Sequence, residues 1–118
     1  MSTYEVDVRG EPPVAVMALE GRIDRDAMTS LTMAYETAVV ADPPVILLDF
    51  TAVDYINSTG IALIVGLLGR ARAEGRTLAA CGLSEHYREI FEITRLADFI
   101  AIYPDEASAT AEDEKEPT

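Results

Sequence analysis

The sequence predicts an α/β fold: a mixed β-sheet that begins with an N-terminal hairpin, continues through β-α-β repeats and carries helices packed on the sheet. Two observations lead to this fold class. Segments of strand length alternate with segments whose apolar residues recur every three or four positions, the pattern of strands and helices in turn. The first two strand-like segments are separated only by a Gly-Glu-Pro-Pro break, so we expect them to pair as a hairpin.

The first half of the chain supplies the hairpin, one helix and the central strand. Residues 4–9 alternate apolar and charged side chains, as a half-buried strand does, and residues 14–19 form a continuous apolar strand. Asp24 is placed to cap a helix over 25–40, whose apolar face consists of Met28, Leu31, Tyr35 and Ala38. Residues 45–50 are apolar almost throughout, which predicts a strand covered on both faces.

The second half repeats the alternation of helix and strand. A helix is predicted over 58–74, where Gly75 stops it, and a short strand follows over 77–81. The remaining elements, in chain order, are a helix that Ser84 caps and that ends near residue 94, a strand over 99–103, and a helical turn or more over 105–111. We expect a single domain over residues 1–111 and a disordered acidic tail over 112–118.

The charge balance limits the kinds of partner. The chain has 21 acidic residues against 9 basic ones, and its formal net charge is −12 at pH 7. Such an excess of negative charge argues against binding to nucleic acid or to an anionic membrane surface, because both are themselves negatively charged. A basic surface on another protein is the partner that this charge favours.

The composition is compatible with the cytoplasm. The single cysteine, Cys81, excludes an internal disulfide, as is usual in a reducing compartment. The sequence begins MSTYEVDVRG, which lacks the apolar core of a signal peptide. The longest apolar run, residues 60–69, is too short to span a bilayer. We therefore expect a cytoplasmic protein.

A polar corner, Asn57-Ser58-Thr59, leads directly into an unusually apolar helix. Asn and Ser are common N-caps, because their side-chain oxygen accepts a free backbone N–H, and capping alone is one explanation of the corner. The helix behind it is apolar on all sides, through Ile61, Leu63, Ile64, Val65, Leu67 and Leu68. One sheet covers only one face of such a helix, so the rest must meet other helices or a partner. Asp24 also follows a strand, so it can line the same end of the sheet.

The same helix contains three glycines, Gly60, Gly66 and Gly69. Each costs roughly 1 kcal/mol relative to alanine in a helix interior, so their presence indicates the close approach of another backbone. Packing on the protein's own sheet is expected to explain one or two of the three, and contact with a partner is the alternative for the others.

Residues that support catalysis or metal binding do not occur in combination. The Gly-rich turn lacks the lysine of a phosphate-binding loop, and no G-x-S-x-G nucleophile elbow is present. Cys81 ends a strand and is predicted to be a buried structural cysteine, whereas His86 is predicted to face solvent. One Cys and one His do not make a zinc site. The sequence therefore predicts no enzyme, no metal and no cofactor.

Three stretches resemble the STAS domain, the fold of bacterial anti-sigma factor antagonists: VAVMALEGRID, VILLDFTAVDYINSTGIALIVGLL and LAACGLSEHYREIFEITRLADFIAIYPDEASA. The resemblance covers nearly the whole chain. The middle stretch is the most specific, because it resembles the family's strand followed by Asp, a hydrophobic residue, Asp or Asn, two small hydroxyl residues, Gly and a hydrophobic residue. Aspartate is the commoner family residue at the position of Asn57.

This resemblance implies a regulatory role. In the family, an anti-sigma factor that is also a serine-protein kinase binds the unphosphorylated antagonist and releases its sigma factor. Phosphorylation of a serine at the start of this helix ends that interaction, and a metal-dependent serine phosphatase removes the phosphate. By the motif the acceptor is Ser58, with Thr59 as the alternative. The implied partner-binding residues are Asp24, Asn57, Ser58, Thr59, Gly60, Ile61, Leu63 and Ile64.

Other functions are compatible with the same residues. A STAS scaffold without phosphorylation, or a small-ligand sensing module in a signalling complex, would share the fold. An enzyme that uses Cys81 or Ser58 as nucleophile ranks last, because no base and orienting acid can be found together. The sequence does not determine the oligomeric state.

Overall fold

The computed structural model describes residues 4–9 and 13–109, with the side chains described from Pro13 onward. Its elements are, in chain order, β1 (Tyr4–Arg9), β2 (Val14–Ile23), the 3₁₀ turn η1 (Arg25–Ala27), α1 (Met28–Ala38), η2 (Val39–Ala41), β3 (Val45–Ile56), α2 (Ser58–Ala73), β4 (Thr77–Cys81), α3 (Glu85–Ile93), η3 (Leu96–Asp98) and β5 (Ala101–Tyr103). Residues 106–109 form the beginning of one further helical turn, and the predicted acidic tail over 112–118 lies outside the described residues.

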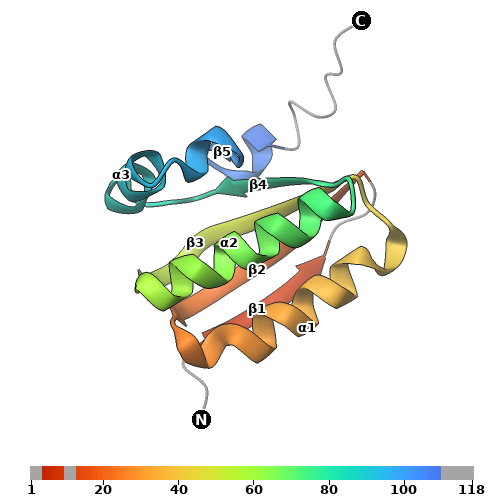
Figure 1. Ribbon diagram of the computed structural model, residues 1–118, viewed down its shortest axis with the longest axis horizontal. Helices are drawn as coiled ribbons and strands as arrows, with labels where there is room; N and C mark the ends of the chain where they lie inside the picture. The colour runs from red at the N-terminus through yellow and green to blue at the C-terminus, as the bar shows by residue number, and fades with distance from the viewer. Residues whose placement is uncertain (1–3, 10–12, 110–118) are drawn as a thin grey trace, which may run out of the picture.

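The strands form one five-stranded sheet in the order β1-β2-β3-β4-β5. β1 pairs antiparallel with β2, and the remaining neighbours pair in parallel, so the predicted N-terminal hairpin and mixed sheet are confirmed. The spatial order equals the chain order, and crossovers between parallel strands are right-handed, which places successive helices on the same face. Figure 1 shows α1 and α2 side by side along that face.

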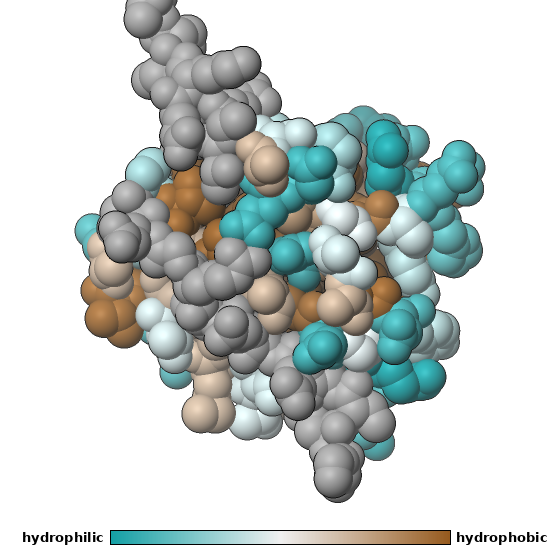
Figure 2. All heavy atoms as spheres, turned by 180° about the vertical axis from the view of Figure 1, so that it is seen from behind, coloured by the Kyte–Doolittle hydropathy of each residue, from teal (hydrophilic) through white to brown (hydrophobic). Residues whose placement is uncertain are grey.

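The main core lies between the sheet and its helices. Ile46, Leu48 and Phe50 of β3 point into it, and the Phe50 ring meets the Phe91 ring of α3 edge to face with 5.9 Å between centroids. Leu47 belongs to a smaller apolar cluster on the opposite face, so β3 is buried on both sides as its sequence predicts. Figure 2 shows that opposite side, where apolar side chains appear among polar ones.

Both central strands extend beyond the apolar stretches that predict them. β2 continues to Ile23 and β3 to Ile56, and their ladder still pairs Arg22 with Tyr55 and Ile23 with Ile56. The register shifts twice along this ladder, and many side chains of the extensions are exposed. The sequence of the extensions therefore does not show the alternation of apolar and polar residues that predicts a strand. The extension matters because it carries the ends of β2 and β3 to the same edge of the molecule.

Two other predicted elements are shorter than expected. The helix predicted over 25–40 is an α-helix only over Met28–Ala38, with a 3₁₀ turn at each end. The strand predicted over 99–103 begins at Ala101, because the backbone N–H groups of Phe99 and Ile100 close the turn of η3 on Leu96.

Among the described helices, none combines the length and the apolar character that crossing a bilayer requires.

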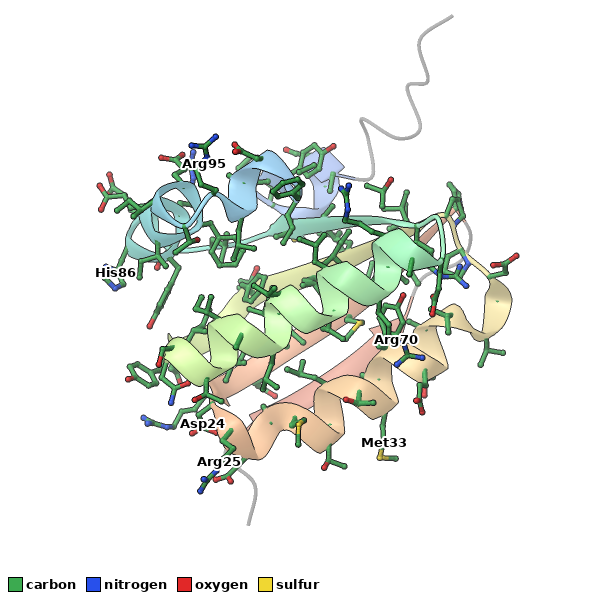
Figure 3. All side chains as sticks on the ribbon, in the orientation of Figure 1. Asp24, Arg25, Met33, Arg70, His86 and Arg95 are labelled. Atoms are coloured by element: carbon green, nitrogen blue, oxygen red, sulfur yellow. The ribbon has the colours of Figure 1, made fainter. Side chains whose placement is uncertain are left out.

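A polar network ties the C-terminal end of α2 to α1. The buried Tyr35 of α1 donates its hydroxyl proton to Glu74 Oε1 at 2.8 Å, and Arg76 Nε donates to the same oxygen at 2.9 Å. Arg76 also donates through Nη1 to the carbonyl oxygen of Pro43 at 2.7 Å. The guanidinium carbon of Arg70 lies 4.7 Å from the centre of the Tyr35 ring. Figure 3 shows Arg70 on the side of α2 that faces α1.

The titration behaviour of this network follows from its hydrogen bonds. The bonds from Arg76 and Tyr35 hold the pKa of Glu74 below its ordinary value. Burial, followed by the bond to Glu74, raises the pKa of Tyr35. Both groups therefore keep their ordinary charge states near neutral pH, and the end of α2 stays fixed to α1.

Candidate partner-binding site at the start of helix α2

Helix α2 begins at an N-cap. Asn57 has an extended backbone, with φ −96° and ψ −176°, and its Oδ1 accepts the backbone N–H of Gly60 at 2.8 Å. The carbonyl oxygen of Asn57 accepts the first intrahelical bond, from Ile61 N–H at 2.9 Å. This geometry satisfies one of the free donors of the first turn and leaves the N–H groups of Ser58 and Thr59 without an intrahelical acceptor. The capping role predicted for the corner is therefore confirmed for Asn57.

The start of α2 is held against the end of β2. The Asn57 N–H donates to the carbonyl oxygen of Ile23 at 3.2 Å. A Cβ atom added at Gly60 would collide with that same carbonyl oxygen, so the close approach predicted from the glycine is confirmed at this position. A Cβ at Gly66 or at Gly69 would meet no atom within 4 Å. The protein's own sheet thus explains one of the three glycines of this helix.

The two hydroxyl residues of the corner have different surroundings. Both Ser58 and Thr59 are exposed. Thr59 lines an open polar depression of about 290 Å³, together with Asn57 and the acidic stretch Asp24-Arg25-Asp26 at the beginning of η1. Ser58 does not line this depression. Asp24 thus lies at the same end of the sheet as the corner, as predicted, and Figure 3 shows Asp24 and Arg25 beside the start of α2.

Asp24 has structural contacts of its own. Its Oδ1 accepts the backbone N–H of Asp26 at 3.0 Å, which caps the η1 turn and confirms a capping role. Its Oδ2 lies 3.8 Å from Nε of Arg22, a long ion pair. The Arg22 guanidinium carbon in turn lies 4.6 Å from the centre of the Tyr55 ring, across the ladder of β2 and β3. These contacts hold the Asp24 carboxylate at the rim of the depression.

The exposed side of α2 forms a continuous surface, which we call the outer face: Ser58, Ala62, Val65, Gly66, Gly69 and Arg72. Val65 is the large apolar residue of this face, with 46% of its surface exposed. The Arg72 guanidinium carbon lies 5.1 Å from the centre of the exposed Phe99 ring. The opposite side of the helix packs into the core through Gly60, Ile64, Leu67, Leu68 and Ala71.

Part of the predicted contact surface needs correction. Ile64 is fully buried and Gly60 is buried against β2, so neither offers a side-chain contact to a partner. Ile61 and Leu63 are half-buried and pack against the core with one side. The residues of the predicted set that reach the surface are Asp24, Asn57, Ser58, Thr59, Ile61 and Leu63, all of them at least partly exposed.

Sequence reasoning did not single out Arg25, Asp26 or the outward position of Val65. The positions of Arg25 and Asp26 could have been predicted. The Asp-Arg-Asp stretch follows one strand and Asn57 follows another, and parallel strands end at the same edge of a sheet. The outward position of Val65 could not be read from a helix that is apolar on all sides, since the direction of the sheet depends on packing.

Two further candidates from the sequence are Cys81 and His86. Cys81 is fully buried, and burial together with the neighbouring Asp49 raises the pKa of its thiol to about 12. His86 is exposed on α3, and Figure 3 shows it pointing away from the sheet. Within residues 13–109, no group of three or more His, Cys, Asp or Glu side chains is arranged to hold a metal ion. Because Cys81 is fully buried, its thiol cannot reach a substrate at the exposed Ser58.

The chain belongs to the STAS domain family, whose domain matches residues 5–109. It is 35% identical over 82 residues to the protein of Listeria monocytogenes named anti-sigma-B factor antagonist. The aligned residues make up 70% of this chain and 72% of that protein. A solved anti-sigma factor antagonist from Mycobacterium paratuberculosis superposes with a TM-score of 0.80 at 20% identity and covers 95% of both chains. The unphosphorylated form of the antagonist SpoIIAA gives 0.75 at 17% identity, over 96% of this chain and 99% of that one. At such identities the solved structures show a shared fold.

Proposed function

We propose that this protein is an anti-sigma factor antagonist that binds a cognate anti-sigma factor in its unphosphorylated form and is switched off by phosphorylation at Ser58. The observation that supports this proposal is the exposed position of Ser58 at the first residue of α2, at the head of an exposed and largely apolar helix face. The partner contacts this face and the rim of the neighbouring depression, where Asp24 lies. A basic surface on the anti-sigma factor suits the net charge of −12.

A phosphate at Ser58 is compatible with the fold. The first turn of a helix exposes free N–H groups and the positive end of the helix dipole, both of which favour a negative charge. Phosphoserine adds a charge of about −1.5 to −2 at pH 7. The same charge in a packed contact with a partner brings desolvation and repulsion, and a loss of about 3 kcal/mol weakens binding more than a hundredfold.

The surroundings of the two hydroxyl groups favour Ser58 over Thr59 as acceptor. Thr59 shares its depression with the carboxylates of Asp24 and Asp26. A phosphoryl group there would stand beside two like charges, which costs electrostatic free energy. Ser58 lies outside that depression. The proposed roles of the corner are therefore a cap at Asn57, an acceptor at Ser58 and a partner contact at Thr59.

The proposal includes two further partners and a compartment. The anti-sigma factor is also the serine-protein kinase, a metal-dependent serine phosphatase removes the phosphate, and the exchange takes place in the cytoplasm. The protein itself acts by binding and has no catalytic activity. The high pKa of Cys81 fits this role, because a buried neutral thiol is a poor nucleophile.

The acceptor is tested by incubating the protein with ATP and the serine-kinase anti-sigma factor of its source cell, followed by mass spectrometry of the product. We expect one phosphate, on Ser58, and no incorporation into Ser58→Ala. Thr59→Ala is the matched control: it removes the other hydroxyl of the corner and should still be phosphorylated. Phosphate on Thr59 alone would show that the acceptor was assigned to the wrong residue. If no phosphate were incorporated although the protein still bound the anti-sigma factor, the result would favour the alternative of a STAS scaffold without phosphorylation.

A further inference from the structure

The second half of β3 has a strand on one side only. β2 continues beside β3 up to Ile56. On the other side, β4 pairs with β3 only as far as Asp49, and the chain then leaves the strand at Gly82, which has a φ of 74°. Among the described residues, no strand therefore pairs with residues 50–56 on the side of β4. The backbone N–H groups that point to that side need water or another acceptor.

Helix α3 contacts both ends of this stretch. At one end, the Phe91 ring meets the Phe50 ring. At the other end, the backbone N–H of Ile56, a residue that is 5% exposed, donates to the hydroxyl oxygen of Tyr87 at 2.9 Å. Tyr87 and Phe91 are one helical turn apart, so they lie on the same face of α3. Figure 1 shows α3 at the end of the molecule where α2 begins.

The corner that carries Ser58 is therefore held from two sides. The Ile56 N–H is bonded to Tyr87 on one side. The next N–H, that of Asn57, is bonded to the Ile23 carbonyl oxygen of β2 on the other side. Since peptide groups are planar, these two bonds fix the direction in which the chain enters α2. Ser58 is exposed, so the position of its hydroxyl group depends mainly on this backbone.

Tyr87 is itself held in place by its surroundings. Its backbone N–H donates to Oγ of Ser84, the N-cap of α3, at 3.2 Å. Its side chain packs against the main core, and the His86 ring meets its ring with 4.8 Å between centroids. A hydroxyl group on a ring that is fixed in this way is an acceptor with a defined position.

We propose that Tyr87 is a positioning residue for the phosphorylation of Ser58. Its hydroxyl group holds the last residue of β3, and through that residue it places the acceptor at the start of α2. This inference rests on the proposed function, and it adds a residue of α3 to a site that is otherwise built from α2 and the strand ends. Without the hydroxyl group, the Ile56 N–H loses its acceptor in a buried position, and the end of β3 must open to reach water.

Tyr87→Phe tests the proposal, because it removes the hydroxyl group and keeps the ring. Tyr35→Phe is the matched control, since it also removes one hydrogen-bonded tyrosine hydroxyl group, at the other end of α2. Amide hydrogen exchange measures opening at the corner, and the deciding amide is that of Gly60, because its acceptor Asn57 is unaltered in both variants. Its exchange rate, relative to that of Leu48 in the middle of β3, should rise at least about tenfold in Tyr87→Phe and should not rise in Tyr35→Phe. Slow exchange of Leu48 itself shows that each variant is folded.

The kinetics of phosphorylation by the serine-kinase anti-sigma factor give the second readout. In Tyr87→Phe we expect kcat to fall at least about fivefold and KM to stay within about twofold, because the contact surface is intact and only the Ser58 hydroxyl group is displaced. Tyr35→Phe should keep both constants. Wild-type exchange at Gly60 in Tyr87→Phe overturns the proposal, and so does an unchanged kcat. A wild type that takes up no phosphate contradicts the proposed function instead, and the exchange of Gly60 then decides alone whether Tyr87 holds the corner.

Discussion

The two ends of helix α2 are built differently. At the C-terminal end, Tyr35, Glu74 and Arg76 form a network of hydrogen bonds that joins α2 to α1 around a buried hydroxyl group. At the N-terminal end, the backbone of Asn57 is fixed to β2, but the side chains of Ser58 and Thr59 are exposed. The comparison shows how a rigid helix can present an accessible acceptor: the fold holds the backbone at both ends and leaves the side chains of Ser58 and Thr59 exposed at one of them.

The largest effect is expected where the backbone at the start of α2 touches β2. Gly60→Ala should lower the free energy of unfolding by about 3 kcal/mol, because the added methyl group collides with the Ile23 carbonyl oxygen and the helix must move. Gly66→Ala is the matched control in the same helix. It meets no atom and should raise the free energy of unfolding by about 0.5 to 1 kcal/mol. Urea denaturation measures both, and equal effects at the two glycines would contradict the account.

The next effect concerns the C-terminal end. Tyr35→Phe removes the hydroxyl group that donates to Glu74, and loss of a hydrogen bond to a charged group should lower the free energy of unfolding by about 1.5 kcal/mol. Thermal unfolding measures this change. Affinity for the anti-sigma factor should stay at the wild-type value. Tyr35 is a fully buried residue of α1, and it contacts the end of α2 that is opposite to Ser58. A large loss of affinity would show that the two ends are coupled.

The same end should respond to acid. The pKa of Glu74 is lowered in the folded protein, so its contribution to stability is present above its ordinary value of 4.5 and is lost as the pH falls through the folded value. Thermal unfolding between about pH 7 and pH 3 measures this loss. Glu74→Gln removes the titrating group, so part of the acid sensitivity should disappear in that variant. An unchanged pH profile would contradict the role of Glu74.

The smallest effect is expected at the cap. Asn57→Ala should lower the free energy of unfolding by about 1 kcal/mol, because the Gly60 N–H loses its acceptor. Asn57→Asp should keep the cap and stay within about 0.5 kcal/mol of the wild type, since the two residues cap equally well. Urea denaturation of the three proteins compares them. If Asn57→Asp destabilised as much as Asn57→Ala, the cap would not explain the residue.

The fold could be predicted from the sequence because each part of it has a local pattern. Three such patterns can be recognised directly in the sequence: the alternation in residues 4–9, the apolar run in 45–50 and the Asn57 cap. The structure contains the corresponding elements. The extensions of β2 and β3 could not be predicted, because their exposed side chains no longer alternate. They depend on backbone pairing between segments far apart in the chain.

The candidate site could be predicted only in part. The position of Ser58 at a helix start follows from local capping rules. The burial of Ile64 and the exposure of Val65 depend on which side of α2 meets the sheet, and a helix that is apolar on all sides does not indicate this. The depression beside Thr59 forms from two strand ends that meet in space, so its lining residues needed the structure.

The central claim is that a charge at Ser58 leaves the fold intact and removes the partner. Calorimetric titration of the anti-sigma factor with the unphosphorylated protein and with the Ser58-phosphorylated protein tests it most directly, with thermal unfolding of both forms measured alongside. We predict that the two forms unfold at nearly the same temperature and that phosphorylation weakens binding by about a hundredfold. Equal affinities for the two forms would contradict the account, and so would a phosphorylated protein that has lost its fold.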